Sequence, residues 1–127
     1  MNVSTAAALG VYPAVSAYSI SKLAMLRLGE YVTVENPNVT AISIHPGIMK
    51  TALVPETSPF WAFSDDEPSL AGCLAVWLTT EEAKFLNGRY VNASWDVDDL
   101  VAKKDEIVEK GELVFVLQGN FGSAQFE

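Results

Sequence analysis

The chain contains 127 residues, of which 50% are hydrophobic, and carries a formal charge of −8. This length and hydrophobic content allow one domain with a core, whereas the acidic charge and the lack of a basic patch argue against nucleic acid as a partner. No apolar run approaches the roughly twenty residues that span a bilayer, so we expect no membrane partner. The single cysteine, Cys73, cannot form an internal disulfide, which favours a cytoplasmic protein with this side chain buried on a helix.

The chain alternates segments with strand and helix character, which predicts an α/β fold with a parallel sheet. A Pro-containing stretch ends the first helix, and Pro68 suits a first helical position. In chain order we expect a strand over 1–4, a helix over 14–35, a strand over 39–45, a loop over 48–67, a helix over 68–79, a strand over 89–93, a helix over 96–110 and a β-like segment over 113–117.

The first predicted helix carries Tyr18 and Lys22, which lie four positions apart and so share one face, about 5–6 Å apart at Cβ. A tyrosine is a poor general base at neutral pH unless a neighbouring cation favours the phenolate, and a lysine is such a cation. A hydroxyl that could hydrogen-bond a substrate carbonyl comes from Ser4 or Thr5, at the end of the first strand, with Thr5 better placed.

These residues resemble the motifs of the short-chain dehydrogenase/reductase family. Members carry a Tyr-x-x-x-Lys pair, a hydroxyl residue thirteen positions before the tyrosine, and a Pro-Gly turn followed by a threonine. The chain matches them at Tyr18 and Lys22, at Thr5, where the family usually has serine, and at the Pro46-Gly47 turn with Thr51. The segment Asn87-Gly88-Arg89-Tyr90-Val91 is similar to a late strand of the family.

The resemblance implies roles for these residues in interconverting an alcohol and a carbonyl compound with NAD or NADP. Tyr18 would be the acid/base, Lys22 would hold the nicotinamide ribose and favour the phenolate, and Thr5 would orient the substrate. The residues implied to contact the nicotinamide end of the cofactor are Tyr18, Lys22, Pro46, Gly47, Ile48 and Thr51.

The family begins with a glycine-rich turn that binds the cofactor pyrophosphate, and the eight glycines of this chain contain no G-x-G-x-x-G. We therefore expect residues 1–127 to be a single partial domain, the C-terminal catalytic half of such an enzyme. Its fold would be a partial doubly wound, Rossmann-like parallel sheet of about three strands with flanking helices. The residues that choose between NAD and NADP would lie in the absent half.

The predicted loop over 48–67 carries Phe60, Trp61 and Phe63. In the family the corresponding segment closes over the substrate, and bulky apolar side chains there would select a hydrophobic carbonyl or alcohol. The same side chains could instead pack on the neighbouring helix or on a partner chain, and the sequence leaves both interpretations open.

Two further features have structural interpretations. His45, the only histidine, precedes a proline at a strand end, and no carboxylate is placed by sequence to orient it, so we expect a structural residue. The acidic cluster Asp96, Asp98 and Asp99 suits a helix N-terminus, and we expect no metal site there.

Three functions therefore stay open. The chain could be the catalytic half of an oxidoreductase, inactive alone, a non-catalytic truncated product, or a module that binds a carbonyl ligand. An unpaired edge of the sheet and an uncovered apolar helix face would favour self-association.

Overall fold

A computed structural model describes residues 1–118. Three parallel strands form one sheet in the order β1-β2-β3, with β1 at Asn2–Val3, β2 at Ser43–His45 and β3 at Tyr90–Asn92. All three residues of β2 are buried, as expected for a central strand covered on both faces. The predicted α/β class and three-stranded parallel sheet are confirmed.

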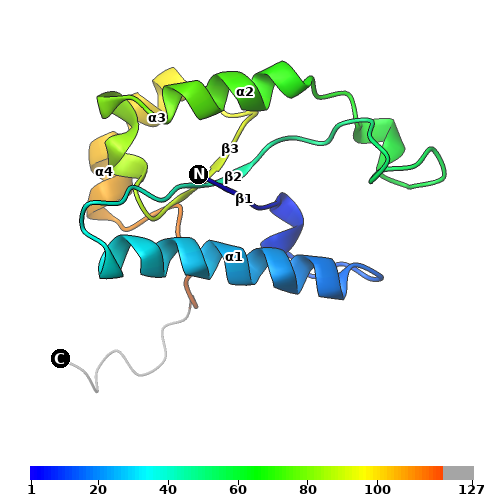
Figure 1. Ribbon diagram of the computed structural model, residues 1–127, viewed down its shortest axis with the longest axis horizontal. Coiled ribbons are helices and arrows are strands. Elements are labelled where there is room, and N and C mark those ends of the chain that lie inside the picture. The colour runs from blue at the N-terminus through cyan, green and yellow to red at the C-terminus, as the bar shows by residue number, and fades with distance from the viewer. Residues whose placement is uncertain (119–127) are drawn as a thin grey trace.

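Helices cover both faces of this sheet. Figure 1 shows α1, at Ser16–Glu35, on one side of the strands and α2, at Pro68–Trp77, on the other. The main core joins the sheet to α2, to α3 at Val97–Ala102 and to α4 at Lys104–Glu109. A smaller cluster lies on the α1 side and contains Ala8, Leu26, Tyr90 and the partly buried Leu23.

The helix boundaries follow from local chemistry. α1 ends at Asn36, whose backbone N–H bonds to the carbonyl of Val32, and α2 begins with the predicted Pro68. Asp96 caps α3 by accepting a hydrogen bond from the backbone N–H of Asp98 at 2.9 Å. The structure also contains three short 3₁₀ helices that the sequence did not indicate, η1 at Ala6–Ala8, η2 at Trp61–Phe63 and η3 at Glu81–Leu86.

Several predicted elements need correction. The helix expected over 96–110 is two helices that meet at Lys103, and each buries one side chain in the core, Leu100 from α3 and Ile107 from α4. The strand expected over 39–45 is confined to β2, because the exposed Val39 closes a turn onto the carbonyl of Asn36. No strand forms over 113–117, where Leu113 has a φ of 62° that interrupts an extended backbone.

Cys73 is exposed on α2, so its predicted burial was wrong. The helix turns Leu74 into the core and leaves its sequence neighbour facing outward. Among the helices of residues 1–118, none combines the length and the apolar character required to cross a membrane.

Candidate functional site

Four of the predicted residues lie where β1 and β2 end. Ser4 and Thr5 follow β1 directly, and Pro46 and Gly47 follow β2. Because the two strands are parallel neighbours, their carboxyl ends lie at the same edge of the sheet. In open α/β sheets, this edge is where ligands bind.

Tyr18 and Lys22 lie in the first half of α1 and face each other, as their spacing predicts. The Lys22 Nζ atom lies 5.9 Å from the centroid of the Tyr18 ring. The same ammonium group donates a hydrogen bond of 3.0 Å to the carbonyl of Val3, the last residue of β1. This bond fixes the lysine against the end of the strand, while the Tyr18 side chain remains 40% exposed.

The two candidate hydroxyls, of Ser4 and Thr5, differ in the hydrogen bonds that they already make. The Ser4 hydroxyl donates to the carbonyl of Lys22 at 3.1 Å, so its single proton is already used. The Thr5 hydroxyl oxygen accepts a hydrogen bond of 3.3 Å from the backbone N–H of Ala7 and thereby caps η1. Within residues 1–118, no hydrogen bond uses the proton of Thr5. Of the two hydroxyls, that of Thr5 is therefore the one with an unused donor in the described part of the chain.

The Pro46-Gly47 turn is closed by Asp66, a residue far from it in the sequence. The backbone N–H of Ile48 donates to Asp66 Oδ2 at 2.7 Å, and the Asp66 N–H donates to the Ile48 carbonyl at 3.2 Å. Gly47 has a φ of 100°, and a Cβ added there would lie 2.7 Å from Asp66 Oδ2. Only glycine combines this backbone angle with such a close approach.

The loop expected over 48–67 folds back on itself beside this turn. Met49 and Asp65 form an isolated antiparallel bridge, and Lys50 Nζ pairs with Asp65 Oδ1 at 2.9 Å. The same Lys50 Nζ lies 5.5 Å from the centroid of the Trp61 ring. The loop is therefore a closed hairpin with an ordered base, which corrects the expectation of an open loop.

The remaining predicted loop residues are largely exposed. Phe60 is 43% exposed and Phe63 71% exposed, so neither is buried against a helix within residues 1–118. Thr51 is exposed as well, and its carbonyl accepts from Val54 N–H at 2.9 Å in a turn at the start of the hairpin.

His45 is buried at the end of β2, and its Nδ1 atom has no partner in the described part of the chain. Burial lowers the pKa of His45 below its ordinary value, and the nearby Asp66 carboxylate partly opposes this shift. The carbonyl of His45 accepts the N–H of Ala93 at 2.9 Å, which extends the pairing between β2 and β3.

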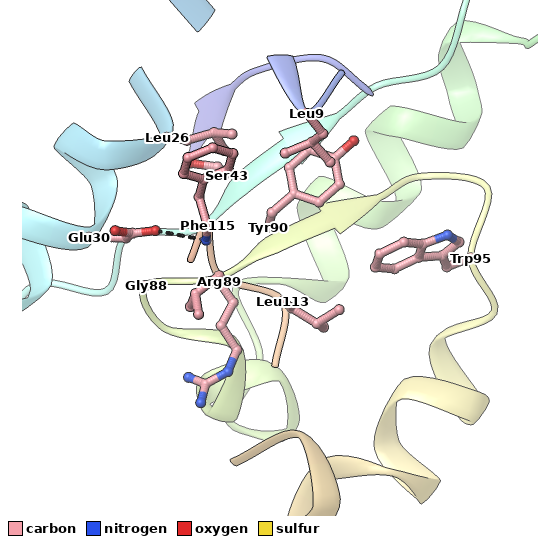
Figure 2. Close-up of a pocket in the computed structure, with 11 residues that line it drawn as sticks. Leu9, Leu26, Glu30, Ser43, Gly88, Arg89, Tyr90, Trp95, Leu113 and Phe115 are labelled. Atoms are coloured by element: carbon pink, nitrogen blue, oxygen red, sulfur yellow. Dashed lines mark hydrogen bonds between the residues drawn. The ribbon is translucent and has the colours of Figure 1, made fainter. Parts of the chain in front are cut away.

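A cavity of about 160 Å³ lies on the α1 side of the sheet, and Figure 2 shows the residues that line it. Leu9, Leu26, Tyr90, Trp95, Leu113 and Phe115 supply most of its apolar wall, and Glu30 Oε1 accepts from Phe115 N–H at 3.3 Å across it. Burial raises the pKa of Tyr90 to about 12. None of the sequence-predicted site residues lines this cavity, so it is separate from the edge that holds Tyr18 and Lys22.

Within residues 1–118, no group of three or more His, Cys, Asp or Glu residues is placed to hold a metal ion. Asp96 serves instead as the cap of α3.

No family model matches the chain. A short chain dehydrogenase of Monascus purpureus is 43% identical over 106 residues, which is 80% of this chain and 36% of that protein. A short chain dehydrogenase of Monascus ruber is 32% identical over 122 residues, or 89% of this chain and 39% of that protein. Another from Aspergillus terreus is 36% identical over 104 residues, or 77% of this chain and 33% of that protein. The chain thus spans between 33% and 39% of the length of these relatives.

A solved structure described as an oxidoreductase from Escherichia coli K-12 superimposes with a TM-score of 0.57. The likeness covers 72% of this chain and 38% of that one at 23% sequence identity. At this identity, the match shows a shared fold.

Proposed function

Because this chain belongs to the short-chain dehydrogenase/reductase family, we propose that it carries the alcohol/carbonyl site of a nicotinamide-dependent oxidoreductase. The observation that supports this most directly is the Lys22 ammonium held between the Tyr18 ring and the end of β1. A phenol beside a fixed cation, at the ligand-binding edge of a parallel sheet, suits proton transfer to or from a substrate oxygen.

Each residue then has a defined part in the reaction. Tyr18 gives its proton to the oxygen of a carbonyl substrate, or takes one from an alcohol. Thr5 donates its free hydroxyl proton to the same oxygen, which holds the reacting carbon beside the phenol. Lys22 lies beside the Tyr18 ring, and only one of its N–H groups is used by Val3, so others remain for a ribose hydroxyl.

The residues of the turn fit the nicotinamide end of NAD or NADP, which when bound would supply or accept the hydride. The Ile48 N–H already bonds an oxygen acceptor, and the missing Cβ of Gly47 allows a group to approach the backbone closely. We propose that the nicotinamide and its ribose contact Tyr18, Lys22, Pro46, Gly47, Ile48 and Thr51. The substrate would be an apolar alcohol or carbonyl compound, because Phe60, Trp61 and Phe63 lie on the hairpin that leaves this turn.

Alone, the chain should bind these cofactors weakly and lack turnover. The hydrogen bonds available at the nicotinamide end contribute about 0.5–1.5 kcal/mol each, whereas association costs about 4–15 kcal/mol. We therefore expect a dissociation constant in the millimolar range or weaker for NAD, NADP and their reduced forms. Calorimetric titration of the purified chain measures this, and micromolar binding would show a complete cofactor site within the chain or across a dimer.

Activity is best tested in a chimaera in which residues 1–118 replace the matching segment of the Monascus purpureus relative. Tyr18→Phe should abolish hydride transfer, followed through the absorbance of the reduced nicotinamide, and leave cofactor affinity nearly unchanged. Lys22→Ala should weaken both. Tyr31→Phe makes the same chemical change at an exposed position on α1 and serves as the control. Wild-type turnover in the Tyr18→Phe chimaera would remove Tyr18 from the mechanism.

If the chimaera binds cofactor but never turns over, the alternative is a non-catalytic ligand-binding segment of the same fold. The exposed Phe60 and Phe63 are the observation that would then favour apolar ligand binding.

A further inference from the structure

The Asp66 carboxylate bonds the backbone of the turn that follows β2. Its Oδ2 atom lies 2.7 Å from the Ile48 nitrogen, which is the short distance typical of a charge-assisted hydrogen bond. The Asp66 Cβ and Cγ both lie 2.9 Å from the position that a Gly47 Cβ would take. The aspartate side chain thus fills the space that the glycine leaves open.

The hairpin that carries Asp66 is joined to the turn by a second, independent pair of contacts. Asp65 bridges to Met49 through the backbone and binds Lys50 through its side chain at 2.9 Å. Adjacent aspartates therefore have different partners: Asp65 closes the hairpin on itself, and Asp66 closes it on the amide of Ile48. Either contact can be removed without the other.

We propose that Asp66 is a latch that occupies the Ile48 amide when the nicotinamide is absent and is displaced from it by the carboxamide oxygen of the cofactor. This inference rests on the proposed function, which puts the nicotinamide at this turn. A backbone N–H carries one proton and makes one strong hydrogen bond, so the two acceptors compete for it.

Displacement of the latch has a structural consequence. Asp66 follows η2 by only a few residues, so its release removes one of the contacts that hold the hairpin arm bearing Trp61 and the exposed Phe63 beside the turn. Cofactor binding and the position of the apolar hairpin would then be coupled, and the substrate surface would form in response to the nicotinamide. Without ligand, the free energy of the Asp66–Ile48 hydrogen bond favours the latched state over the unlatched state.

The test uses the isotope-labelled full chain with nicotinamide mononucleotide, followed by the NMR signal of the Ile48 amide. Only unlatched molecules can bind the mononucleotide, so the latch lowers the apparent affinity in proportion to the fraction of molecules that are unlatched. Asp66→Ala should therefore bind the mononucleotide about tenfold more tightly than the wild type. Asp66→Asn keeps the size of the side chain but loses its charge, and should give a smaller gain of about threefold. Asp65→Ala, the matched control, should leave the affinity unchanged.

The opposing outcomes are distinct. If the wild type binds and Asp66→Ala and Asp66→Asn bind equally well or more weakly, Asp66 supports the turn and the latch is wrong. If the mononucleotide shifts neither the wild type nor any variant at concentrations near its solubility, the nicotinamide site itself is wrong, and the latch is rejected with it. A shift of the Asp66 carboxyl carbon signal on saturation of the wild type would show the displacement directly.

Discussion

Replacing Gly47 by alanine tests the turn on which the proposed cofactor site depends. The backbone angle of Gly47, φ = 100°, is one that residues with a Cβ rarely adopt. The new methyl group would also lie 2.7 Å from Asp66 Oδ2 and 2.9 Å from its Cγ, so the aspartate must move away from the Ile48 amide. The substitution therefore combines backbone strain with the loss of a charge-assisted hydrogen bond.

The two contributions can be estimated separately. A non-glycine residue at positive φ costs about 1–2 kcal/mol, and a hydrogen bond to a charged group contributes about 1.5–3 kcal/mol. Because Asp66 is only partly buried, we expect the lower part of the combined range, a loss of about 3 kcal/mol in the free energy of unfolding. Urea unfolding followed by circular dichroism measures it.

Gly111→Ala separates these contributions. Gly111 also has a positive φ, 62°, but no heavy atom lies within 4 Å of its added Cβ, so only the backbone cost of about 1 kcal/mol should appear. In the double variant Gly47→Ala/Asp66→Ala, the second substitution should cost less than it does alone, since the contact is already lost. If Gly47→Ala were no more destabilising than Gly111→Ala, or if the two changes at the turn were additive, the close approach of Asp66 to Gly47 would be refuted.

Further predictions concern titration and assembly. The pKa of His45 is lowered in the folded chain, so below its ordinary value of 6.5 the unfolded state binds the proton more readily than the folded state. The free energy of unfolding should therefore fall as the pH falls. His45→Gln should remove this dependence in urea unfolding at several pH values. Tyr90, with a pKa of about 12 against an ordinary 10.0, should destabilise the fold as the pH rises above 10.0, and Tyr90→Phe should abolish that component. Ile20 on α1 is 66% exposed and Tyr31 57%, and β1 lies at an edge of the sheet, so sedimentation should show concentration-dependent association, which a monodisperse monomer would contradict.

The sequence predicted the elements whose signals are local. Pro68 marked the start of α2, and the spacing of Tyr18 and Lys22 placed both side chains on one helix face. The order of strands and helices was enough for a parallel sheet. Where a tertiary contact decides the outcome, local pattern failed. The helix expected over 96–110 breaks at Lys103, where the chain turns to bury both Leu100 and Ile107 in the core.

The hairpin after β2 was the largest omission at the site. Its residues have the Pro and Asp content of an open loop, and the pairing of Met49 with Asp65 joins positions whose sequence carries no alternation of apolar and polar residues. From the sequence, Asp66 could be predicted only to be an acidic residue of a loop. A carboxylate accepts from whichever amide the fold brings to it, so its partner, the Ile48 N–H eighteen positions earlier, could not be read from spacing.

The contacts at the site divide its residues into fixed and movable groups. The Lys22 ammonium donates to the Val3 carbonyl, and the Ser4 hydroxyl donates to the Lys22 carbonyl. These two bonds join α1 to the end of β1 and hold the cation rigidly. The turn after β2 depends instead on Asp66, a side chain from a hairpin that can open without breaking the sheet. If the proposed function and the Asp66 latch hold, the proton-transfer geometry would stay constant at β1 and α1 while the turn after β2 adjusts to the ligand. If the proposed function holds, Tyr18 and Lys22 should therefore tolerate changes in the hairpin, and Asp66→Ala should alter the affinity for the ligand more than the rate of the proton transfer.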